Sequence, residues 1–192
     1  MTEMATHVVQ IAQSSISALS ALIGRQVHRV YAPSLDIAGT HVAAPSFSVP
    51  ISDQIGEAWV HRFVNLKAIW SETPRFMNDY WEIQASADQT PVGISVTAEN
   101  AMLSPCSISF YENGGSMLTA IKVYSLSIPD LEDENESVLY DKALQFVREN
   151  GSSFCVACQL NGPGIAEFVR LSEDPKVIQE LLEDCHLRLT LA

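Results

Sequence analysis

The chain has 192 residues, of which 47% are hydrophobic and 18% charged, and this length and composition predict a globular protein with its own core. Its 11 Lys and Arg residues are outnumbered by 23 Asp and Glu residues, which leaves a net charge of -12. Such a field repels phosphate backbones and anionic lipid surfaces, so we expect neither a nucleic-acid nor a membrane partner. Basic proteins and cationic ligands would be attracted, although solubility alone also explains the charge.

The N-terminus carries Glu3 where a signal peptide has Lys or Arg, and polar residues interrupt its apolar runs. The sequence therefore predicts no signal peptide, no transmembrane span and a cytoplasmic location. In that reducing compartment the four cysteines are expected to be free thiols. They are Cys106, Cys155, Cys158 and Cys185.

Residues 4–22 are predicted to form a helix that ends near Gly24. No Asp, Glu, Lys or Arg occurs from Met4 to Gly24. An uncharged outer face has two explanations, a second copy of the chain that covers it or a weakly polar Ser/Gln face in water. The first makes the protein a homodimer through residues 4–22. The predicted inner stripe is Val8, Ile11, Ala12, Ser15, Leu19 and Leu22.

Alternation of apolar and polar residues predicts strands with one buried face in the rest of the first half. Residues 37–57 are rich in Pro, Gly, Ala and Ser, and Pro45 and Pro50 bracket a short extended piece. A turn is expected around Pro74. The predicted strands are 25–36, 58–70, 79–86, 92–97 and 106–111.

The second half contains clearer local signals. Asn150-Gly151 predicts a tight hairpin, and Asp174-Pro175 predicts the start of a helix that runs to about Asp184. Turns are also expected at Asn113-Gly114-Gly115 and Asn161-Gly162-Pro163-Gly164. The predicted strands are 117–126, 138–148, 152–160, 165–171 and a last one that points Leu187, Leu189 and Leu191 inward and His186, Arg188 and Thr190 outward.

These elements predict an α+β fold, mainly antiparallel sheet, with an N-terminal helix and a C-terminal helix followed by a last strand. We predict one domain over residues 1–192, with two sub-lobes, 1–112 and 113–192, as the alternative. Closure into a barrel, packing as a sandwich and two α+β lobes all remain open at this stage.

Motifs for catalysis or metal binding are scarce. Cys155-x-x-Cys158 lies within a predicted strand, where residues three apart point to opposite faces, so we interpret both as buried structural cysteines. A redox motif would place the first thiol at a helix N-terminus, and a zinc site would need further spaced ligands. The sequence contains neither a Gly-x-Ser-x-Gly motif nor a phosphate-binding glycine loop. We therefore assign no catalytic residue, no metal and no cofactor.

The most acidic segment carries five carboxylates and no basic residue between positions 129 and 137. Such charge blocks are usually solvated loops. The alternative interpretation is an attachment surface for a basic protein. Its residues are Asp130, Glu132, Asp133, Glu134 and Glu136.

A second group combines aromatic residues with a histidine and a carboxylate on the predicted strands 58–70 and 79–86. Pairing of these strands across Pro74 is expected to bring the group together. A ligand pocket, an acid–base pair and a packed second face of the sheet are the alternatives. The group consists of Trp59, His61, Phe63, Tyr80 and Glu82.

We therefore expect a protein-interaction domain that binds a basic partner, for example an immunity-type inhibitor of a toxic nuclease. The alternative is a small-molecule-binding protein or enzyme whose cavity has His61 and Glu82 as polar anchors. A structural subunit that dimerises through residues 4–22 is the third hypothesis.

Overall fold

The computed structural model describes residues 5–55, 58–73, 79–97, 99, 102–103, 105–129, 136–159 and 168–192. The strands of this part of the chain form an eight-stranded sheet, a five-stranded sheet and a two-stranded ribbon. Apart from β1 with β12, every described strand pair is antiparallel. The predicted fold class is confirmed, with one helix near the N-terminus and one before the last strand.

The larger sheet has the strand order β15-β11-β12-β13-β14-β4-β3, and β1 pairs with β12 beside this path. Strands from both halves of the chain share this sheet. Their bounds are β1 (Ala5–Val9), β3 (Asp36–Ala38), β4 (His41–Ala44), β11 (Leu118–Pro129), β12 (Glu136–Arg148), β13 (Ser153–Gln159), β14 (Phe168–Ser172) and β15 (Cys185–Leu191).

The smaller sheet has the order β10-β2-β5-β6-β7. Its strands are β2 (Arg29–Ala32), β5 (Ser46–Ile55), β6 (Ala58–Glu72), β7 (Asp79–Asp88) and β10 (Cys106–Ser109). The ribbon and the helices are β8 (Ser95–Val96), β9 (Met102–Leu103), α1 (Gln13–Ser20) and α2 (Pro175–Leu181). Neither described helix has the length and apolar character needed to span a membrane.

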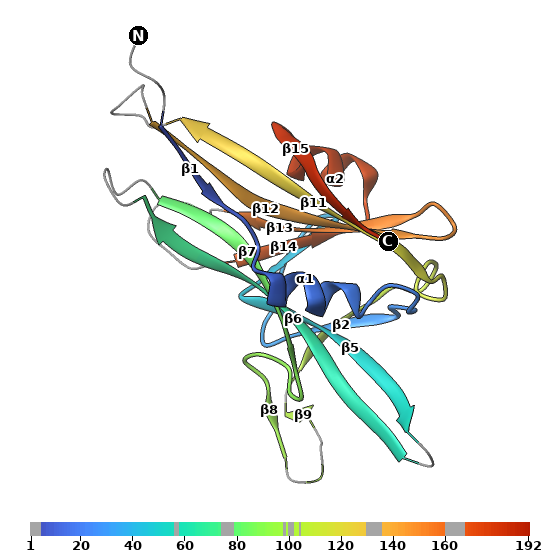
Figure 1. Ribbon diagram of the computed structural model, residues 1–192. Coiled ribbons are helices and arrows are strands. Elements are labelled where there is room, and N and C mark those ends of the chain that lie inside the picture. Colours follow the sequence, from blue (N-terminus) through green and yellow to red (C-terminus); the bar gives the residue numbers. More distant parts are fainter. Residues whose placement is uncertain are drawn as a thin grey trace.

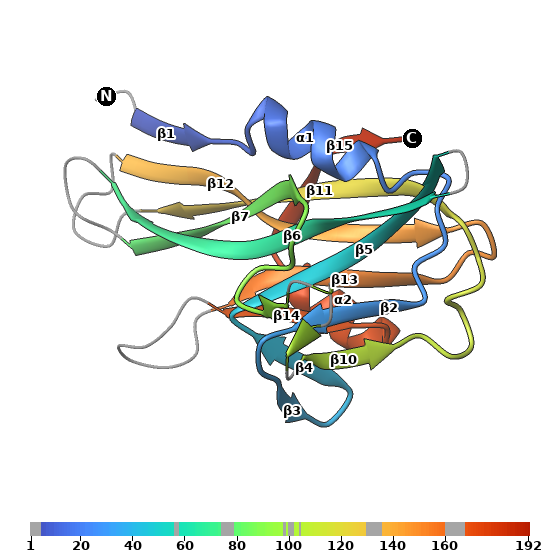
Figure 2. The same ribbon diagram turned by 90° about the horizontal axis from the view of Figure 1, so that it is seen from below.

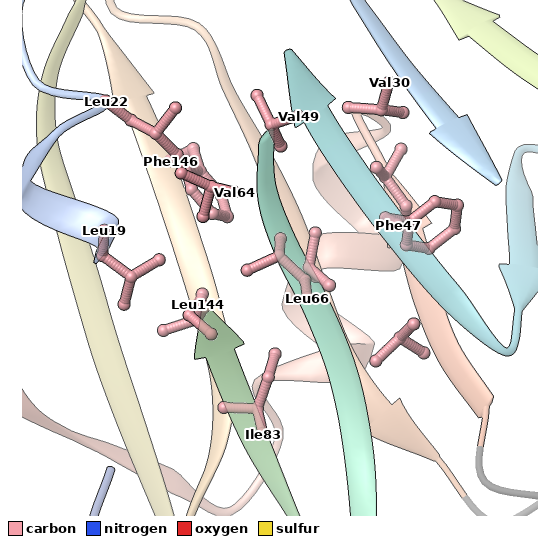
Figure 3. Packing of buried hydrophobic residues seen from close by; sticks show 14 of the residues in the cluster. Leu19, Leu22, Val30, Phe47, Val49, Val64, Leu66, Ile83, Leu144 and Phe146 are labelled. Carbon is pink, nitrogen blue, oxygen red and sulfur yellow. The ribbon is translucent and has the colours of Figure 1, made fainter. Parts of the chain in front are cut away.

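The main core lies between the two sheets, which face each other with α1 against β7 (Figures 1 and 2). Alternate residues of β5, β6, β12 and β13 point into this layer, as the period of two in a strand requires. Residues of opposite parity on β12 and β13 pack under α2, which therefore covers the other face of the larger sheet. The core side chains labelled in Figure 3 are Leu19, Leu22, Val30, Phe47, Val49, Val64, Leu66, Ile83, Leu144 and Phe146.

The prediction of one helix over residues 4–22 is wrong in its first half. Residues 5–9 form β1, which runs parallel to β12 with Ala5 opposite Glu136 and Val9 opposite Tyr140. Only Gln13–Ser20 is helical, with Ser15, Ala18 and Leu19 buried. The β-branched side chains Thr6, Val8 and Val9 favour a strand once an edge is available, and β12 supplies that edge. The outer side of α1 exposes Gln13, Ser14, Ser17 and Ser20.

The predicted orientation of the last strand is also wrong in part. Leu189 and Leu191 pack on the core, but Leu187 is 50% exposed. The β11–β15 register shifts between Val123 and Tyr124, so Arg188 has no partner residue on β11 and points to Asp141 instead of outward. A β-bulge changes the side-chain parity along a strand, and nothing in the local sequence marks this one.

Two local signals in the second half of the sequence are confirmed, the Asn150-Gly151 turn and the helix start at Asp174-Pro175. Gly151 has a φ of 83° in the β12–β13 turn, and the Asp174 side chain caps α2 by accepting a hydrogen bond from the Lys176 N–H. The helix ends at Leu181, earlier than predicted. The segment predicted to contain one short extended piece forms β4 and the ten-residue β5. The predicted turns at Pro74 and at 161–164 lie outside the described residues.

Candidate functional site

Most of the acidic segment lies outside the described residues, namely Asp130, Glu132, Asp133 and Glu134. Glu136 is described in its backbone, as the first residue of β12 and the partner of Ala5. The role of this segment as an attachment surface therefore stays a prediction.

The structure does not bring together the second predicted group, which we call the His61 group (Trp59, His61, Phe63, Tyr80 and Glu82). Strands β6 and β7 pair as expected, but their register places Glu82 opposite Ile69 and Tyr80 opposite Ser71. His61 lies eight residues further along β6, which corresponds to about 26 Å of extended strand. The expected proximity of His61 and Glu82 is wrong because the hairpin pairs Glu72 with Asp79, whereas the proposed contact needed a turn four residues nearer the N-terminus.

The members of this group have separate neighbours. His61 is exposed, and its Nδ1 lies 2.8 Å from Oγ of Ser52 on β5. Phe63 is buried and packs edge-to-face with Tyr31. Trp59 is paired through its backbone with Gln54.

At the other end of the hairpin, Tyr80 is buried and its ring packs against Tyr140. Glu82 is partly buried; burial and, secondarily, the charge of Asp141 raise its pKa. Phe63 and Tyr80 are therefore packing residues, and the β6–β7 register keeps His61 and Glu82 from sharing one ligand pocket.

The Ser52–His61 pair resembles a nucleophile and its base in composition only. A triad also needs a carboxylate to orient the histidine. The neighbouring Asp53 instead pairs with Arg62 at 2.7 Å and with Arg25 at 2.5 Å, and hydrogen bonds from Arg62 and Arg25 lower its pKa. We therefore assign these residues a structural role, the stabilisation of the β5–β6 hairpin.

The cysteine interpretation is confirmed by the fold. None of the four cysteines, all of which belong to the described residues, forms a disulfide, and Cys155 and Cys158 lie on opposite faces of β13. Burial raises the pKa of Cys155 to about 12, so its thiolate is scarce at neutral pH. Among the described residues, no three His, Cys, Asp or Glu side chains are arranged to hold a metal ion.

A pocket of about 250 Å³ is formed by three segments that are distant in sequence, residues 40–42, 108–110 and 171–174. Strand β14 pairs with β4, which places Leu171 opposite Val42. Ile108 of β10, in the smaller sheet, and Phe110, which follows this strand, line the other side. The apolar walls are Val42, Ile108, Phe110 and Leu171.

Phe110 is held in this wall by two backbone hydrogen bonds. Its N–H donates to the His28 carbonyl at 2.9 Å, and its carbonyl accepts from the Gly114 N–H at 2.9 Å. A Cβ at position 114 would collide with the Phe110 carbonyl oxygen and the His28 Cα. Only glycine therefore fits the turn that places the Phe110 ring.

The polar side of the pocket is organised by Ser172 at the end of β14. Its hydroxyl donates to the Thr40 carbonyl at 2.8 Å and accepts from the Asp174 N–H at 3.0 Å. Asp174 in turn caps α2 through one carboxylate oxygen. His41 accepts a hydrogen bond from Arg170 at 2.6 Å, and burial and Arg170 lower the pKa of His41, which favours the neutral ring.

Behind the pocket lies Arg148, whose side chain has no exposed surface. Its Nη1 donates to Glu173 at 2.8 Å, and its guanidinium carbon lies 4.9 Å from the ring centre of Phe110 and 5.0 Å from that of Phe154. Nε and Nη2 are buried without a hydrogen-bond partner. Glu173 remains 32% exposed at the pocket.

A second buried ion pair lies at the bulges of the larger sheet. The Asp141 carboxylate is fully buried and accepts four hydrogen bonds of 2.5–2.8 Å, two of them from Arg188 and the others from the Ile11 N–H and the Ser125 hydroxyl. Because both of its oxygens are used twice, we assign this cluster a structural role.

The sequence contained one usable signal for these residues. Arg148 has the same strand parity as the buried Leu144 and Phe146, so a charge at the end of an apolar face was visible. No local pattern marks Asp141 or Glu173, because their partners come from distant segments. Searches against protein-family models, curated proteins and solved structures found no match to the chain.

Proposed function

We propose that the protein is a binding module for a basic protein partner. The observation that supports it best is the pocket between β4, β10 and the start of α2, which combines apolar walls with two carboxylates. A concave apolar site with a few polar groups is the usual form of a recognition site. An immunity-type inhibitor of a toxic nuclease is one concrete form of this proposal.

The surroundings of the pocket favour a cationic partner. The two segments that contain its polar side, residues 36–44 and 168–184, carry six carboxylates but only Arg170 and Lys176 as bases. Complementary charge increases the rate of encounter and excludes wrong partners. The carboxylates are Asp36, Glu173, Asp174, Glu180, Glu183 and Asp184.

An exposed apolar residue flanks the pocket. Ile37 on β3 is 69% exposed and lies directly opposite Val42 in the antiparallel pair, so both side chains are on the same face. Interfaces typically surround a central anchor with such contacts, which exclude water. We name Ile37 together with the pocket the β4–α2 face.

The test begins with the immobilised chain in a native lysate, followed by purification of the captured protein and measurement of its association rate at several ionic strengths. We expect a basic partner whose association slows as salt rises, because salt screens exposed charges. Replacement of Asp36 by Asn and Glu180 by Gln should slow association several-fold.

The matched control removes the same charge elsewhere, by Glu72→Gln with Glu149→Gln, and should have a smaller effect. A separate variant measures how much the acidic segment contributes to the association rate. It converts to amides the residues Asp130, Glu132, Asp133, Glu134 and Glu136. A captured partner that is not basic, or one that binds all variants equally at every salt concentration, would contradict the proposal.

A further inference from the structure

The pocket has unused hydrogen-bonding capacity on its acidic side. Glu173 contacts Arg148 through Oε1, and Asp174 caps α2 through Oδ1. Among the described residues, no hydrogen bond to the second oxygen of either carboxylate is found. Two adjacent carboxylates with free acceptor positions therefore face a pocket that has apolar walls.

The charge at this site favours a cation as the occupant. The arginines nearest the polar side are Arg148, behind Glu173, and Arg170, bound to His41. Glu173 and Asp174 carry the opposite charge to these arginines. Two further carboxylates, Glu180 and Asp36, lie near enough to His41 for their charges to affect its pKa. Because the pKa of His41 is lowered, this ring adds little positive charge.

The size of the pocket limits what can enter. Pockets for drug-sized ligands typically enclose roughly 300–1,000 Å³, whereas this one encloses about 250 Å³. A single long side chain matches this volume better than a cofactor or a nucleotide does. The apolar walls suit an alkyl stem, and the carboxylates suit a charged end.

The structure already contains one guanidinium that is bound by an aromatic ring and a carboxylate of this pocket. Arg148 already places a guanidinium against the Phe110 ring and pairs it with Glu173, from the inner side of the same wall. A guanidinium is planar, weakly hydrated and able to bridge two oxygens, while an ammonium is a strongly hydrated point charge. Beside an aromatic ring and two carboxylates, the guanidinium is the better match.

We propose that the pocket formed by residues 40–42, 108–110 and 171–174 receives an arginine side chain presented by the basic partner. This inference rests on the proposed function, and it names the group that the β4–α2 face recognises. The stem lies between Val42, Ile108 and Phe110, and the guanidinium bonds to the free oxygens of Glu173 and Asp174.

The test uses N-acetyl-arginine methylamide as the probe and compares it with its lysine and citrulline counterparts in amide NMR titrations of the full chain. We expect saturable shifts from the arginine probe in residues 40–42, 108–110 and 171–174. The lysine probe should bind more weakly, and the neutral citrulline probe should not bind. Equal shifts from all three probes, or no shift at these residues, would overturn the proposal.

Two variants separate charge from shape. Glu173→Gln should weaken binding of the arginine probe about tenfold, since it removes a charge-assisted hydrogen bond, and Ile108→Trp should abolish binding by filling the pocket without changing the charge. Glu72→Gln, which removes a charge from the exposed surface of β6 and does not line the pocket, is the matched control and should bind like the parent chain. Far-UV circular dichroism and the unfolding midpoint verify that each variant is folded.

The purified partner distinguishes this inference from the proposed function. If the basic partner binds but Ile108→Trp leaves its affinity unchanged, the arginine pocket is wrong and the proposed function stands. If the arginine probe binds but no basic partner is captured, the assignment of the arginine to a protein partner is wrong. Loss of partner affinity in Ile108→Trp, together with probe binding by the parent chain, supports both.

Discussion

The molecule contains two arginine–carboxylate pairs with opposite asymmetry. In the Asp141–Arg188 pair the carboxylate is fully buried, and Arg188 is 19% exposed. In the Arg148–Glu173 pair the arginine is fully buried, and Glu173 is 32% exposed. The first carboxylate accepts four hydrogen bonds, whereas Arg148 leaves Nε and Nη2 without partners.

This difference separates a structural contact from a site that has unused hydrogen-bonding positions. Asp141 joins the segment before α1 to β11 and β15, and both of its oxygens are occupied. Glu173 neutralises a buried charge with one oxygen and offers the other to a pocket. Burial of a charge costs the least free energy when all of its hydrogen bonds are formed. An ion pair at the surface whose carboxylate uses only one oxygen is therefore a place where another group can bind.

The largest effect is expected from Asp141→Ala. This substitution leaves Arg188, the Ile11 N–H and the Ser125 hydroxyl without their acceptor, and breaking such a buried pair costs about 3–5 kcal/mol. Urea unfolding followed by circular dichroism measures the loss, with Glu183→Gln as an exposed control that should change little. A loss as small as that of the control would show that the cluster does not hold the sheet.

A smaller and asymmetric effect is expected at the second pair. Glu173→Ala leaves Arg148 buried without its counter-ion, at a cost of about 2 kcal/mol given the partial exposure of the carboxylate. Arg148→Met keeps an apolar contact with the phenylalanine rings and should cost about 1 kcal/mol or less, since Glu173 can be solvated. The same unfolding assay measures both, and a greater loss in Arg148→Met would reverse our ranking of the two partners.

The pH dependence of stability should show the effect of Glu82, which lies near Asp141. Burial, more than the Asp141 charge, raises the pKa of Glu82. Because the folded pKa exceeds the unfolded one, the protonated carboxyl contributes stability that is fully present below the unfolded pKa and is lost as pH rises through the folded pKa. Glu82→Gln should therefore gain less than about 1 kcal/mol at neutral pH, an upper bound that allows for the partial exposure of Glu82, and nothing at about pH 3. An equal gain at both pH values would assign the effect to packing.

Thiol labelling should give the smallest but most selective signal. Cys155 is buried and has its pKa raised to about 12, so in the native protein it should react with iodoacetamide only through unfolding. Cys106 is only partly buried and should react earlier. Mass spectrometry assigns the order, with labelling in denaturant as the control. Rapid native labelling of Cys155 would show that α2 opens readily.

Elements with local signals were predictable from the sequence. The alternation in residues 58–70 and 79–86 marked β6 and β7, and Asn150-Gly151 and Asp174-Pro175 marked a turn and a helix start. These features depend on neighbouring residues, so the sequence alone was sufficient.

Features that depend on distant pairing were not predictable. Strand β1 forms because β12 offers an edge 131 residues away in sequence, and the bulge at Arg188 becomes visible only in the register. The predicted proximity of His61 and Glu82 was wrong because the register of a hairpin depends on the position of its turn, and hydrophobic alternation alone does not determine that position. The pocket joins three segments that share no motif, and only Arg148 left a trace in the strand pattern.

The most direct test of the comparison follows the side-chain Nε–H signals of Arg148 and Arg188 during a titration with N-acetyl-arginine methylamide. Our account predicts that the Arg148 signal shifts together with the amides of residues 171–174, because its partner Glu173 binds the probe, while the Arg188 signal stays constant. A constant Arg148 signal, or equal shifts of both arginines, would contradict the claim that the Glu173 pair is open to a ligand and the Asp141 pair is closed.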